Sequence, residues 1–105
     1  MESGRGRFRR SEGGEDARRE LREEILGLRR ELELLDEVLN AGPTPLSARA
    51  ALDRSFFFLR TAERAWRGSR QPGDLMIVVR RLEGARAGLD DALEALRRRA
   101  ARAGL

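Results

Sequence analysis

Three stretches of the chain repeat apolar residues at helical spacing, and short turn-forming segments separate them. In the first stretch the apolar positions alternate between four and three residues apart, which is typical of a heptad seam along an α-helix. These positions are Leu21, Ile25, Leu28, Leu32, Leu35 and Leu39. Gly42 and Pro43 predict an end, because glycine adopts the left-handed conformation of a C-cap and proline cannot continue a helix. The pattern predicts a helix over residues 15–40.

The second stretch begins directly after this stop. Thr44 and Pro45 form a start signal, because a hydroxyl can cap the first backbone N–H groups and proline suits the first helical position. The expected core face comprises Ala48, Leu52, Phe56, Leu59 and Trp66. The pattern fades near Gly68, so we expect a helix over residues 45–68.

A Pro-Gly turn over residues 71–74 separates the second and third stretches, and Asp74 is a candidate N-cap for the next helix. Gly84 and Gly88 interrupt that helix, at about 1 kcal/mol each relative to alanine. They either let a neighbouring helix approach closely or are merely tolerated, and we favour the simpler second interpretation. The third helix is expected over residues 74–103, with a core face of Leu75, Val78, Leu82, Ala85, Leu89, Leu93, Leu96 and Ala100.

The predicted fold class is all-α. Because the connections are short, consecutive helices should pack antiparallel, as an up-down-up three-helix bundle that forms a single domain over residues 15–105. The alternative is an open helical hairpin whose third helix completes its core only in a dimer. Residues 1–14 alternate glycine and serine with charge and can bury too little apolar surface to offset their ordering entropy. We expect them to form a disordered arm rich in arginine and glycine.

Several large apolar residues fall off the expected core faces. Scattered surface apolars are normal in soluble proteins, but these can also form a second surface that is buried by self-association or by a larger partner protein. We favour the second interpretation, because an aromatic residue flanked by leucines is the composition of an interface anchor. The predicted partner interface comprises Leu26, Leu34, Phe57, Phe58 and Ile77.

Composition narrows the chemistry. The 105 residues include no Cys, His, Lys or Tyr, so all 22 basic residues are arginine and there is neither a thiolate nucleophile nor an imidazole base. We therefore expect no catalytic residue, no cofactor and no metal, and a protein that is not an enzyme. No apolar run approaches the length of a membrane span, so we expect a cytoplasmic protein without integral membrane association.

Closely spaced carboxylates are the remaining route to enzyme chemistry, because carboxylate oxygens on adjacent helices can hold Mg²⁺. They alternate with arginine, as residues on a solvated helix face do, which makes a metal-dependent enzyme the weakest hypothesis. The groups concerned are Glu20, Glu23 and Glu24, then Glu33 with Asp36, and Asp90 and Asp91 with Glu94.

Two arginine clusters support a different alternative, an accessory nucleic-acid-binding protein. Arginine binds phosphate through paired hydrogen bonds, and a phenylalanine can stack on a base. The simpler interpretations are a solubilising arm and a basic helix C-terminus that complements the helix dipole. The leading hypothesis is therefore protein–protein contact, with nucleic-acid binding as the alternative. The candidate residues for nucleic acid are Arg5, Arg7, Phe8, Arg9 and Arg10 in the arm and Arg97, Arg98, Arg99 and Arg102 in the tail.

Overall fold

The computed structural model describes residues 10–104, with side chains from Gly14 onward, and this part of the chain is all-helical. It contains α1 (Arg10–Asn40), α2 (Leu46–Gly68) and α3 (Leu75–Arg102), with a 3₁₀ turn, η1 (Pro72–Asp74), immediately before α3. The predicted all-helical class and the three helices are confirmed within the described residues, which form no strand. The second and third helices match their predicted ranges to within one residue at each end.

The start of α1 differs from the prediction. The helix begins at Arg10, inside the segment expected to belong to a disordered arm over residues 1–14. Once a helix is nucleated, each added residue gains a backbone hydrogen bond, and here η1 lies beside the extension. A Cβ on Gly14 would lie 3.4 Å from the Pro72 ring. The rest of the predicted arm, residues 1–9, lies outside the described residues.

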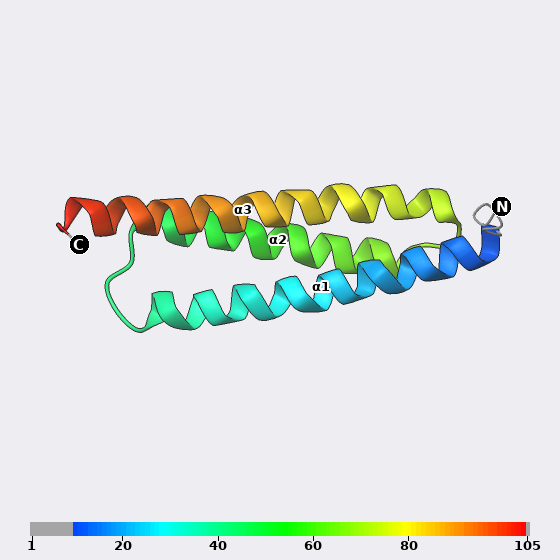
Figure 1. The fold of residues 1–105 in the computed structure, drawn as a ribbon, viewed down its shortest axis with the longest axis horizontal. Coiled ribbons are helices and arrows are strands. Elements are labelled where there is room, and N and C mark those ends of the chain that lie inside the picture. The colour runs from blue at the N-terminus through cyan, green and yellow to red at the C-terminus, as the bar shows by residue number, and fades with distance from the viewer. Residues whose placement is uncertain (1–9, 105) are drawn as a thin grey trace, which may run out of the picture.

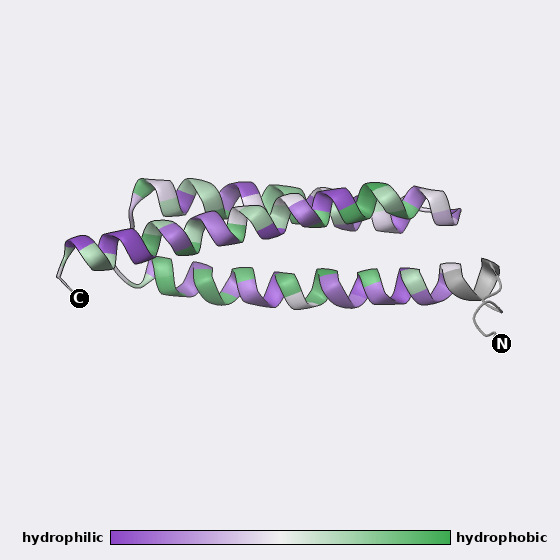
Figure 2. Cartoon of the chain, turned by 45° about the horizontal axis from the view of Figure 1, so that its top comes forward, coloured by the Kyte–Doolittle hydropathy of each residue, from purple (hydrophilic) through white to green (hydrophobic). Residues whose placement is uncertain are grey.

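The chain reverses direction at each connection, so α1 and α3 start at the same end of the molecule (Figure 1). α2 packs closely along α3 and makes fewer contacts with α1, while α1 and α3 touch least. The molecule is elongated, with extents of 57 × 30 × 17 Å. Apolar and polar residues alternate along all three helices (Figure 2), as the heptad-like spacing requires. α2 therefore links the other two helices.

The core is built in two different ways. α1 contributes large side chains from its seam, and Leu28 and Leu32 are fully buried. The contact between α2 and α3 instead uses small residues, which allow the two backbones to approach. The buried small residues are Ala48, Ala51, Ser55 and Ala62 on α2 and Ala85, Gly88 and Ala92 on α3.

Gly88 lies at the closest point of this contact. A Cβ added there would lie 2.9 Å from the Cβ of Ser55 and 3.0 Å from the carbonyl oxygen of Ala51. The Ser55 hydroxyl is fully buried and donates a hydrogen bond to the carbonyl oxygen of Ala85, so the backbones are also joined by a polar contact. The interpretation of Gly88 as merely tolerated is wrong, because the position has no room for a methyl group.

The polar caps differ from the sequence-based expectations. Thr44 does not cap α2, and its hydroxyl donates to the carbonyl oxygen of Leu39 at the end of α1. Gly42 does not adopt the expected left-handed conformation. The Asp74 carboxylate accepts hydrogen bonds from the backbone N–H groups of Arg70, at 2.9 Å, and Gln71, at 3.1 Å, so it caps η1 and not α3. Thr44 and Asp74 therefore both bind backbone groups that precede them in the sequence, and neither caps the helix that follows it.

We expect Gly88→Ala to destabilise the fold by about 1–3 kcal/mol, the usual cost of forcing extra volume into a packed contact. Helix propensity alone favours alanine by about 1 kcal/mol, so a loss of stability reports the steric contact. Gly27→Ala is the matched control, because nothing lies within 4 Å of its added Cβ, and this variant should be stabilised. Urea unfolding followed by circular dichroism measures both; stabilisation of both variants would contradict the close contact.

The two backbone hydrogen bonds to Asp74 lower the pKa of its carboxyl below the ordinary value. Such a group stabilises the fold at pH above its unfolded pKa of about 3.9, and the contribution is lost as the pH falls through the folded value. We expect Asp74→Asn to unfold at lower urea concentration than the wild type at neutral pH, and the difference to close under acid conditions. A difference that stays constant with pH would contradict this role of the carboxylate.

Candidate partner interface

Most of the predicted interface residues are exposed. The exposed fractions are 53% for Phe57, 43% for Leu26, 57% for Leu34 and 53% for Ile77, whereas Phe58 is half-buried against the core. The sequence interpretation missed Val38, which is 64% exposed. Its position four residues after Leu34, on the same side of the helix, was the available signal. The described residues therefore leave a considerable apolar surface outside the core.

Phe57 points away from both neighbouring helices. On the same helix Glu63 binds Arg29 of α1, and Ser55 binds the backbone of α3. At about 100° per residue, Phe57 lies about 120° around α2 from Glu63 and about 160° from Ser55. Its ring meets that of Phe58 edge-on, with centroids 5.7 Å apart and planes at 70°. This aromatic pair fixes Phe57 on the outer side of α2.

Phe58 joins this surface to α3. Its ring covers Gly84, where an added Cβ would come within 3.0 Å of the ring atoms. Ile77 precedes Gly84 by seven residues, two helical turns, and so lies on the same side of α3. We call Phe57 and Phe58, together with Ile77 two turns along α3 from the Phe58 contact, the aromatic face. Exposed arginines lie on the same outer sides of the two helices, namely Arg60, Arg64, Arg80 and Arg81.

The two leucines on the back of α1 belong to different parts of the surface. Leu26 lines a depression together with Glu63 and Trp66, so it borders α2. Leu34 lies about 160° around α1 from Asp36, whose carboxylate binds Arg49 of α2 at 2.8 Å. Leu34 therefore points away from α2. The structure does not bring the five predicted interface residues together as one patch.

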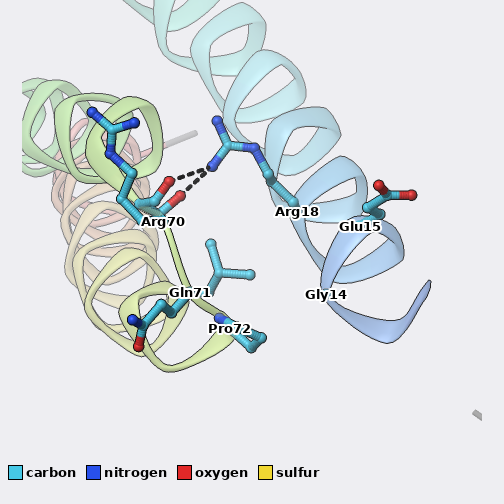
Figure 3. Close-up of a pocket in the computed structure, with 8 residues that line it drawn as sticks. Gly14, Glu15, Arg18, Arg70, Gln71 and Pro72 are labelled. Carbon is cyan, nitrogen blue, oxygen red and sulfur yellow. Dashed lines mark hydrogen bonds between the residues drawn. The ribbon is translucent and has the colours of Figure 1, made fainter. Parts of the chain in front are cut away.

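A hollow of about 390 Å³ lies where the start of α1 meets the α2–α3 connection (Figure 3). Arg18 reaches across from α1 and donates to the carbonyl oxygen of Trp66 at 2.9 Å and to the carbonyl and hydroxyl of Ser69. Its guanidinium also lies 4.2 Å from the centroid of the Trp66 ring, and the indole N–H donates to the Arg18 carbonyl at 2.9 Å. These contacts join α1 to α2. Sequence patterns could not predict them, because Arg18 and Trp66 are 48 residues apart.

The carboxylates that were candidates for metal binding are dispersed. Within the part of the chain whose side chains are described, no three acidic groups converge on a point that could hold a metal ion. Several bind arginine instead: Asp36 binds Arg49, and Asp91 binds Arg54 at 3.2 Å. Nor is any of the described helices long and apolar enough to cross a membrane.

The arginine clusters are placed only in part. Glu94 binds Arg97 at 3.1 Å and Arg98 at 3.3 Å, which reduces the positive charge that these two side chains offer. Arg99 and Arg102 are exposed in the last turn of α3. In the predicted arm, Arg5, Arg7, Phe8 and Arg9 lie outside the described residues, and the side chain of Arg10 does too.

Comparison with protein-family models, with curated proteins and with solved structures finds no match to this chain.

We expect Arg18→Lys to destabilise the fold by about 1–2 kcal/mol, because an ammonium cannot stack on Trp66 and bind the helix-end carbonyls together. The only tryptophan of the chain makes the change visible, since its emission should move as the ring loses its cover. Arg30→Lys, at an exposed position farther along the same helix, should change neither stability nor emission appreciably. Equal effects of the two variants would show that Arg18 does not bind α1 to α2.

Proposed function

We propose that this protein is a non-enzymatic, antiparallel three-helix bundle that acts by protein–protein contact, with the aromatic face as its contact surface. The observation that carries the proposal is the half-exposed ring of Phe57, held in place on the rigid α2–α3 pair. Burying apolar surface contributes about 25 cal/mol per Å², so covering this ring and its neighbours favours association. Self-association and docking on a larger protein are the two forms that such a contact can take.

The support for Phe57 as an anchor is its preorganisation. Association costs free energy when flexible side chains must be ordered, and a ring that is already held loses little freedom. Phe58 packs against the ring edge, and the missing side chain of Gly84 leaves the space in which Phe58 lies. Aromatic residues dominate the energetic centres of interfaces, and arginine is also enriched there. The aromatic face has two phenylalanines, and exposed arginines lie on the same sides of its two helices.

The support for a role without catalysis is compositional. Neither histidine nor cysteine is present in the sequence, and Arg18, which lines the hollow beside the α2–α3 connection, donates to carbonyl groups within the fold. Nucleic-acid binding through the two arginine clusters stays a prediction. Glu94 is shared by Arg97 and Arg98 and offsets at most one of the four positive charges of the tail, so the preference for protein contact rests on the exposed ring of Phe57.

We expect Phe57→Glu to leave the helicity intact, because the side chain lies outside the core, and to weaken association. Loss of an interface anchor costs about 2 kcal/mol or more, which corresponds to association weaker by about 30-fold. Sedimentation of the full chain over a range of concentrations measures the effect. Leu46→Glu is the control: Leu46 is 86% exposed at the first residue of α2, eleven residues before Phe57, so its replacement should leave association unchanged.

If the wild type associates and Phe57→Glu associates equally well, the aromatic face is not the contact surface. A wild type that sediments as a single chain at every concentration would remove self-association and leave only docking on a larger partner.

A further inference from the structure

A second exposed apolar surface lies on α1, and its surroundings are acidic. Leu34 and Val38 are one turn apart and more than half exposed, and we call them the apolar edge. Residues 15–42 contain nine acids and five arginines, a net charge of −4. Arg18, Arg29 and Asp36 of this range bind groups on or just after α2, so the remaining eight acids and three arginines have a net charge of −5. From residue 23 to the end of this helix, the exposed acids are Glu23, Glu24, Glu31, Glu33 and Glu37, against one exposed arginine, Arg30, one turn before Leu34.

The aromatic face has the opposite charge. Its four surrounding arginines are exposed, and residues 43–69 contain five arginines and two acids, a net charge of +3. The acid one turn before Phe57 is Asp53, and Arg49 binds its carboxylate at 2.9 Å. An incoming acidic helix therefore meets arginines around the aromatic face.

These two surfaces cannot meet within one chain. The apolar edge points away from α2, because Leu34 lies about 160° around α1 from the Asp36 carboxylate that binds α2. The aromatic face lies on the outer sides of α2 and α3, where the Phe58 ring covers Gly84. Since both surfaces are on rigid helices, only another molecule can join one to the other.

We propose that the apolar edge of one copy of this chain docks on the aromatic face of a second copy. The inference rests on the proposed function and names the partner. Leu34 and Val38 would pack against the Phe57 and Phe58 rings while the acids of α1 approach the arginines. Complementary charges favour this orientation over others.

The contact joins unlike surfaces, so it is heterologous. A pair of copies keeps one free apolar edge and one free aromatic face, and it therefore adds further copies until a ring closes or a filament forms. The edge of a single helix is narrower than a standard interface of about 1,600 Å², so association should be weak and should depend on concentration. Its charged component should also weaken as salt shortens the Debye length.

The decisive experiment mixes two variants of the full chain, each of which has lost a different surface. Phe57→Glu places an acid on the aromatic face and retains the apolar edge. Leu34→Arg places a base on the apolar edge and retains the aromatic face. Each variant alone should sediment with the mass of one chain, whereas an equimolar mixture should form a complex of two chains and nothing larger.

The wild type should exceed the mass of two chains as its concentration rises. The inference is overturned if the wild type associates but the mixture stays at the mass of one chain, because like surfaces would then be paired. It is also overturned if the wild type remains a single chain, because the occupant is then not a second copy. In the first case the aromatic face survives as a contact surface, provided that Phe57→Glu alone has lost its association. Circular dichroism of both variants confirms that they are folded.

Discussion

The close contact between α2 and α3 at Gly88 is the constraint on which the arrangement depends. With Ser55 and Ala51 against the glycine, the two backbones lie too near for any large side chain to fit between them. Bulky residues of α2 must therefore be placed around this contact. Phe56 packs partly against the core and Phe58 covers Gly84, where space is again left by a missing side chain. Phe57, about 100° from each, has no interior position available. Its exposure follows from the packing of its neighbours.

α1 is attached by a different kind of contact. Its leucine seam packs into the core that it shares with α2 and α3, and polar contacts with α2 fix its position along that helix. Arg18 on Trp66, Arg29 on Glu63 and Asp36 on Arg49 are spaced along the helix. Partly exposed ion pairs contribute little individually, so the seam supplies most of the attachment and the pairs set the register. The remaining charge of α1 is left on its outer side.

The three helices could be predicted from the sequence because heptad spacing is a property of each segment alone. The helix caps could not be predicted. Thr44 lies between α1 and α2 and Asp74 lies at the junction of η1 and α3, and the neighbouring sequence does not determine which of the two helices each side chain caps. The role of Gly88 depends on a residue 33 positions earlier, Ser55, and no periodicity shows that contact. Similarly, a helical projection gives the angle between Leu26 and Leu34. The position of α2 must also be known to tell that Leu26 borders that helix and Leu34 points away from it. The exposure of Val38, in contrast, could have been predicted, because Val38 follows Leu34 by four residues and so lies on the same side of α1.

Charge also argues against the symmetric alternatives to the proposed contact. If two aromatic faces met, the arginines of one copy, Arg60, Arg64, Arg80 and Arg81, would lie against the same four of the other. If two apolar edges met, the glutamates of two α1 helices would be brought together. Like charges at an interface disfavour a pairing even where the apolar residues fit, so both like-with-like arrangements are opposed. The pairing of edge with face is the one arrangement of these surfaces in which apolar cover and charge act in the same direction.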